Sequence, residues 1–109
     1  MRHYETLFIV RPDLEQDVVD SIASEVEKMI LDTGGVLFES DIWGRKRLAN
    51  HIKGFAEGIY LKLNFGAETN TLGRLRTFFK MNENVIKHLL VLQEYEKPRD
   101  EPVEVAEVE

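Results

Sequence analysis

The 109-residue sequence predicts one α+β domain in which a four-stranded antiparallel sheet carries two helices on one face. Two observations predict this fold. Four apolar segments of strand-like composition are interleaved with two amphipathic segments in the order β-α-β-β-α-β. Hydrophobic residues make up 43% of the chain, which suffices for one compact core.

The first predicted strand covers His3 to Val10, a segment rich in aromatic and β-favouring residues. Arg11-Pro12-Asp13 ends it, because proline has no amide hydrogen to donate to a neighbouring strand. Apolar residues then recur at helical spacing from Leu14 to about Thr33. We expect Asp13 to be the N-cap of this helix and Gly34-Gly35 to stop it.

A long second strand is predicted from Val36 to Ala49, with a bend at Gly44, where a glycine is typical of a β-bulge. Residues 50–57 are expected to form a connection. The segment from Ile59 to Phe65 alternates between apolar and polar residues, which predicts a half-buried strand. The residues expected to face away from its core are Tyr60, Lys62 and Asn64.

The second predicted helix runs from Glu68 to Met81, with Thr69 or Asn70 as its cap. Its expected buried residues are Leu72, Leu75, Phe78 and Phe79. A turn at residues 82–84 leads to a last strand, Val85 to Leu92. This order of elements is that of the ferredoxin-like fold. We assign residues 1–95 to this domain and expect residues 96–109, with six acids and two bases, to be a flexible acidic tail.

Charge is strongly segregated along the chain. The formal net charge is −6, which by itself disfavours nucleic acid as a partner. However, residues 42–95 hold nine basic residues against four acidic ones, a net of +5. A molecule polarised in this way can present a basic surface to phosphate despite its negative total.

Motifs for enzymatic chemistry are absent from the sequence. It has no glycine-rich phosphate loop of either common pattern and no cysteine. His3, His51 and His88 lack the spacing of metal ligands, and we expect His88 to be a structural residue of the last strand. No apolar run approaches the length needed to cross a bilayer. We therefore predict a cytoplasmic, non-enzymatic protein without cofactor, metal, membrane or small-molecule substrate.

The densest basic cluster is the segment from Gly44 to Lys53, which contains Arg45, Lys46 and Arg47. These cations could contact several phosphates, or they could protect the edge of a sheet from aggregation, and the sequence leaves both readings open. Tyr4 is favoured as a core residue over a stacking group for a base. An RNA recognition motif would need several aromatic residues on the open face of the third strand. Tyr60 is the single aromatic residue expected there, so this kind of base recognition is disfavoured.

These residues resemble the family of bacterial small-subunit ribosomal protein number six, over nearly all of residues 1–95. The resemblance rests on segments in a specific order and spacing. They are Met1-Arg2-x-Tyr4-Glu5, Ile9-Val10-x-Pro12-x-Leu14, Gly34-Gly35, Gly44 to Ala49 with Ile52-Lys53, Gly58-x-Tyr60, and Asn82 to Lys87. One departure is Asn50-His51, where the family commonly has tyrosine and proline, which puts contacts of that ring in doubt.

The resemblance implies a structural protein of the small ribosomal subunit that binds the central domain of 16S ribosomal RNA. It also implies a heterodimer with ribosomal protein number eighteen, a small basic partner that acidic surfaces here would complement. Carried over by position, Arg2, Tyr4, Lys80 and Lys87 form the implied RNA-facing set, to which we add Arg45, Lys46 and Arg47. The alternative that the fold leaves open is a regulatory domain that binds a small metabolite.

Overall fold

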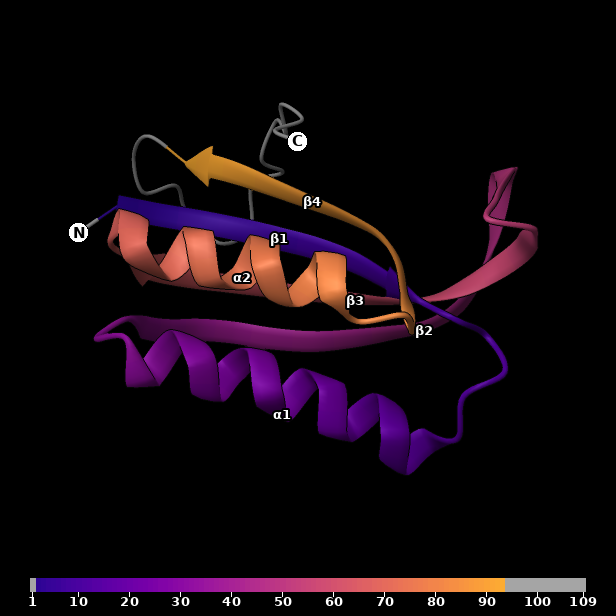
Figure 1. Ribbon diagram of the computed structural model, residues 1–109, viewed down its shortest axis with the longest axis horizontal. Helices are drawn as coiled ribbons and strands as arrows, with labels where there is room; N and C mark the ends of the chain where they lie inside the picture. Colours follow the sequence, from indigo (N-terminus) through magenta and orange to yellow (C-terminus); the bar gives the residue numbers. More distant parts are fainter. Residues whose placement is uncertain (1, 94–109) are drawn as a thin grey trace.

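The computed structural model describes residues 2–93 and confirms the predicted βαββαβ order (Figure 1). The elements are β1 (Arg2–Val10), α1 (Gln16–Asp32), β2 (Val36–Ile52), β3 (Phe55–Ala67), α2 (Thr69–Met81) and β4 (Val85–Gln93). The strands form one antiparallel sheet in the order β2-β3-β1-β4. Both helices cover the same face of this sheet. The predicted acidic tail lies outside the described residues.

The main core lies between the helices and one face of the sheet. Alternate residues of β1 and β3 face it, so Phe8 pairs with Leu61 across the two central strands and both are almost fully buried. From above, α1 contributes Val26 and Ile30, while α2 contributes Leu75. Within the described residues, no helix is long and apolar enough to span a membrane.

Two buried threonines satisfy their hydroxyl groups inside this core. The Thr6 hydroxyl donates to the carbonyl oxygen of Leu89 on the neighbouring strand, at 3.0 Å. The hydroxyls of Thr33 and Thr71 share a hydrogen bond of 2.6 Å, which joins the end of α1 to α2. Because an unpaired buried polar group is destabilising, both bonds are part of what the core requires.

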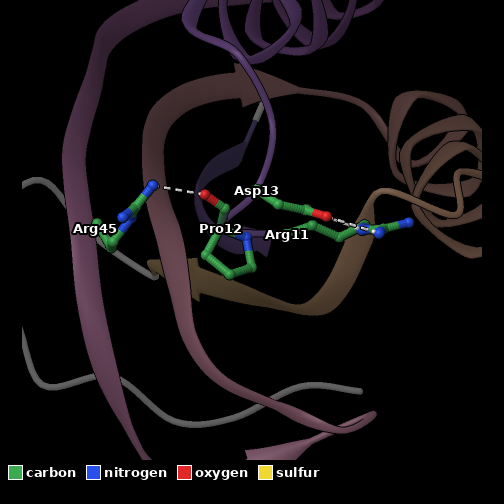
Figure 2. A network of polar contacts seen from close by, with 4 residues as sticks. All are labelled: Arg11, Pro12, Asp13 and Arg45. Atoms are coloured by element: carbon green, nitrogen blue, oxygen red, sulfur yellow. Dashed lines mark hydrogen bonds and ion pairs between the residues drawn. The ribbon is translucent and has the colours of Figure 1, made fainter.

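The predicted helix caps are wrong, although the predicted stop of α1 is confirmed. Helix α1 begins two residues later than expected, with Glu15 at the N-cap in place of Asp13, and α2 has Glu68 there in place of Thr69 or Asn70. Arg11 donates two hydrogen bonds, of 2.9 and 3.2 Å, to the Asp13 carboxylate (Figure 2). This charge-assisted pair holds the carboxylate outside the helix. Gly34 ends α1 in the left-handed region, with φ of +89°.

The predicted connection at residues 50–57 is also wrong. Strands β2 and β3 continue through this region and are joined by the two-residue turn Lys53-Gly54, flanked by the pair Ile52 and Phe55. Lys53 and Gly54 have φ of 51° and 85°, and positive φ at both central residues defines the turn type that fits a twisted hairpin. A lysine at the first position hides this turn from sequence rules that look for Asn-Gly or Asp-Gly. The bend predicted at Gly44 is confirmed by a register shift between Ile42 and Gly44.

Gly58 provides a test of the packing between β3 and β1. A Cβ at this position would lie 2.2 Å from Cγ2 of Ile9, so we expect Gly58→Ala to lower the free energy of unfolding by about 1–3 kcal/mol. Gly73→Ala in α2 is the matched control, because a Cβ there meets nothing within 4 Å. The control should stabilise by up to about 1 kcal/mol. Urea unfolding followed by the fluorescence of the single tryptophan measures both, and equal effects would contradict the packing.

Candidate nucleic-acid interface

The end of the β2–β3 hairpin forms a basic arm, defined here as residues 45–57. It extends past the end of β1 and β4 (Figure 1). The three predicted phosphate-contacting residues lie on it and are exposed, as is Lys53 in the turn. Arg45 also donates a hydrogen bond of 2.7 Å to the carbonyl oxygen of Pro12, as Figure 2 shows. The side chains of Lys46, Arg47 and Lys53, by contrast, make no hydrogen bond or ion pair with any described residue.

A second apolar cluster anchors the arm to β1 and β4. Leu48 of the arm packs with Ile9 of β1 and Ile86 of β4, all of them buried. Partly buried residues complete the cluster; they are Ile52, Phe55 and Tyr60. The guanidinium of Arg11 lies 5.3 Å from the centre of the Phe55 ring. A two-stranded hairpin alone is marginally stable, so the position of the arm depends on this cluster.

Lys80 and Lys87 lie toward the same end of the sheet as the arm. Lys87 is exposed and pairs with Ile9, beside the apolar cluster. Lys80 is exposed in the last turn of α2, where a cation also interacts favourably with the carbonyl end of the helix. Lys87 thus adds to the basic surface of the arm. Lys80 precedes Lys87 in the chain and is separated from it by the turn at residues 82–84.

Arg2 and Tyr4 lie at the opposite end of β1. Arg2 is exposed and pairs with Ala67 at the end of β3. Tyr4 is only 6% exposed and its ring lies 5.8 Å from that of Phe65, stacked within the core. The structure therefore separates the predicted set into two groups and gives Tyr4 a packing role. A contact between any of these residues and RNA stays a prediction.

The face of the sheet opposite the helices carries the predicted Tyr60 and, besides it, aromatic rings of Trp43, Phe38 and His3 that the sequence analysis did not place there. Trp43 is 44% exposed and stacks on Tyr60, with 6.4 Å between ring centres and an interplanar angle of 8°. The ammonium of Lys62 lies 5.6 Å from the Trp43 ring. Nearer the start of β2, the ring of Phe38 packs against that of His3, with 5.0 Å between the ring centres. Two bulges in β2, at Phe38 and at Trp43, direct these rings outward. The sequence predicted only the second of these bulges, from Gly44.

Acidic side chains lie among these rings. Asp41 accepts a hydrogen bond from the indole nitrogen of Trp43 at 3.1 Å, and Glu39 accepts one from Asn64 at 3.0 Å. Glu5, on the same face, accepts from Gln93 at 3.2 Å. We call this surface the open face, comprising His3, Glu5, Leu7, Phe38, Glu39, Asp41, Trp43, Tyr60, Lys62, Asn64 and Leu89. It is aromatic and acidic, whereas the arm is basic.

One carboxyl group near the arm has a shifted pKa. The hydrogen bonds from Arg11 lower the pKa of Asp13, because they favour its charged form. Any stability from this pair is present above the pKa of an unfolded aspartate and is lost as the pH falls through the lowered value. Asp13 and Arg11 are both exposed to solvent, so the effect on folding is small.

Comparison with known proteins gives one consistent family. The family described as Ribosomal protein S6 matches residues 3–92. A small ribosomal subunit protein bS6 from Syntrophomonas wolfei is 38% identical over 95 residues, which cover 86% of this chain and 98% of that protein. The bS6 of Gloeobacter violaceus is 35% identical over 84% of this chain and 95% of its own. The crystal structure of 30S ribosomal protein S6 from Thermotoga maritima superposes with a TM-score of 0.80 at 25% identity, covering 84% of this chain and 87% of that one.

The dependence of the arm on the second apolar cluster leads to a local prediction. Leu48→Ala removes the buried side chain that the arm contributes, so we expect the free energy of opening the arm to fall by about 2 kcal/mol. Native-state hydrogen exchange should show faster exchange for amides of residues 45–57, while those of Leu61 and Leu63 in the main core change little. A uniform loss of protection across the arm and the main core would contradict an independently anchored arm.

Proposed function

This chain belongs to the Ribosomal protein S6 family, and we propose that it binds the central domain of 16S ribosomal RNA together with ribosomal protein number eighteen. Family membership makes it a structural component of the small ribosomal subunit and not an enzyme. The finer assignment of surfaces to RNA and to the partner protein rests on the charges and exposed rings described above. Nothing found in the comparisons favours the alternative of a metabolite-binding regulatory domain.

The RNA surface that we propose is the basic arm together with Lys87 and Lys80. The observation that carries this proposal is the group of exposed cations at one end of the sheet, which have no ion pair among the described residues. Lysine and arginine that point into solvent can neutralise phosphates, and such contacts position a protein on RNA. Arg2, at the far end of β1, would be a separate contact.

The surface that we propose for the partner protein is the open face. Exposed aromatic rings such as Trp43 are typical anchors at protein interfaces, whereas scattered single apolar residues are not. The carboxylates of Glu5, Glu39 and Asp41 would attract a basic partner and repel RNA. This division of surfaces lets one small protein bind both components at once.

The RNA surface is tested by removing its charges. In the variant Lys46→Gln/Arg47→Gln/Lys87→Gln, we expect the slope of log affinity against log salt to fall in magnitude by about 2–3, because each phosphate contact adds about 0.7–0.9. Binding to a central-domain RNA fragment is measured across a salt series with the partner present. Lys28→Gln on α1 is the control and should leave the slope unchanged. An unchanged slope in the triple variant would remove the arm from the RNA surface.

The partner surface is tested by truncating its central ring. Trp43→Ala should weaken binding of ribosomal protein number eighteen by about 2 kcal/mol, as expected for a central aromatic anchor. Leu31→Ala is the control, because Leu31 is also an exposed apolar residue, 54% exposed, but lies on α1 on the other side of the sheet. Calorimetry without RNA measures both variants, and equal affinities would show that the partner binds elsewhere.

A further inference from the structure

A groove runs along the outer surface of α2, on the side of the molecule opposite the open face. Its volume is about 1060 Å³, and Met29 of α1 forms part of its wall. Its other residues include Asn70, Gly73, Arg74, Thr77 and Phe78, which recur at helical spacing along α2. Neither the arm nor the open face includes any of these residues.

Gly73 faces the open space of this groove. A Cβ at this position would meet nothing within 4 Å, so no packing contact in the fold requires a glycine there. Glycine is the least favourable residue in a helix interior apart from proline. Its presence in the middle of α2 therefore costs helix stability with no gain in packing, and the space beside it has room for a larger group.

The charge of α2 indicates which kind of ligand the groove would bind. The helix contains Arg74, Arg76 and Lys80 and no acidic residue, and none of the three forms an ion pair with a described residue. Helix α1 beside it has five acidic residues and one basic residue. A basic protein would be repelled by α2, whereas a phosphate group would be attracted to Arg74 at the groove. Glu83, at the far end of the groove, is its one acidic lining residue.

The chemistry of the lining suits a nucleotide. Phe78 is half-buried: its ring packs on the core and lies edge to face with Phe79, and its exposed part lines the groove, where a base can contact it. The side-chain amide of Asn70 has donors and an acceptor. This amide makes no hydrogen bond with any described residue. Arginine next to a stacking ring and an amide is the combination with which proteins bind an unpaired base and its phosphate.

We propose that this groove receives one unpaired nucleotide of the bound RNA, with its base against Phe78 and its phosphate near Arg74. The inference rests on the proposed RNA-binding function and adds a second RNA contact, on a different surface from the arm. It predicts that the RNA contact extends along α2 from Lys80, at the end of the helix, to the groove.

The test fills the groove without disturbing the fold. Gly73→Leu places a side chain into the open space, and we expect the affinity for the central-domain RNA to fall about tenfold, as for loss of one stacked base, with the salt slope unchanged. Gly73→Ala is the matched control, which adds only a Cβ and should change the affinity less than about twofold. Arg74→Gln should instead lower the magnitude of the salt slope by about 0.7–0.9. Wild-type affinity in Gly73→Leu would overturn the inference.

Two further measurements separate the possible outcomes. RNA substituted with 4-thiouridine and irradiated on the wild-type complex should cross-link to the peptide that contains Phe78, which tests the contact without any variant. Absence of that cross-link, or weaker binding of Gly73→Leu to the partner protein without RNA, would also overturn the inference. If wild-type RNA binding responds to the arm variants but not to Gly73→Leu, the groove fails and the proposed function stands. If the wild type binds no RNA with its partner present, both fail.

Discussion

The pairing of β1 with β3 determines which residues of this protein are core and which are surface. Nine consecutive residues of β1, Arg2 to Val10, pair with Ala67 to Ile59 without a register shift. Since side chains alternate across a strand, this one register places Phe8 and Leu61 under the helices and directs Glu5 and Lys62 to the open face. A slip of one residue would exchange the two sets. The core, the open face and the position of the arm all depend on this pairing.

Periodicity predicted the parts of the fold in which each residue's environment follows from its neighbours along the chain. The alternation of Ile59 to Phe65 and the helical stripe of α1 carried enough information to give the element order and the sheet. The N-cap predicted for α1 was wrong because the Asp13 carboxylate accepts its hydrogen bonds from Arg11 and the helix begins only at Gln16. The arm was missed because its anchor, Leu48 with Ile9 and Ile86, joins three strands that are distant in sequence. No local pattern encodes such a cluster.

The candidate surfaces, like the fold, were predictable where they depend on residues close together in the chain. Counting charges located the basic cluster at residues 45–47, and the structure shows these side chains exposed on the arm. The same count could not show that Arg2 and Lys87 lie at opposite ends of β1, because that depends on the pairing of β4. Nor could it show Trp43 stacked on Tyr60, since a bulge changes the direction in which Trp43 points. Long-range pairing and bulges are therefore what sequence reasoning lacked.

The negative net charge is compatible with RNA binding because opposite charges occupy different surfaces. Acidic residues predominate on α1 and on the open face, and basic residues predominate on the arm and on α2. Tyr60 of the open face stacks on Trp43 and also packs on the apolar cluster that anchors the arm. A partner that buries Trp43 would restrict Tyr60 and thereby reduce the freedom of the arm. RNA binding to an arm that is already ordered would cost less conformational entropy, which gives a physical route by which the partner protein would strengthen binding to RNA.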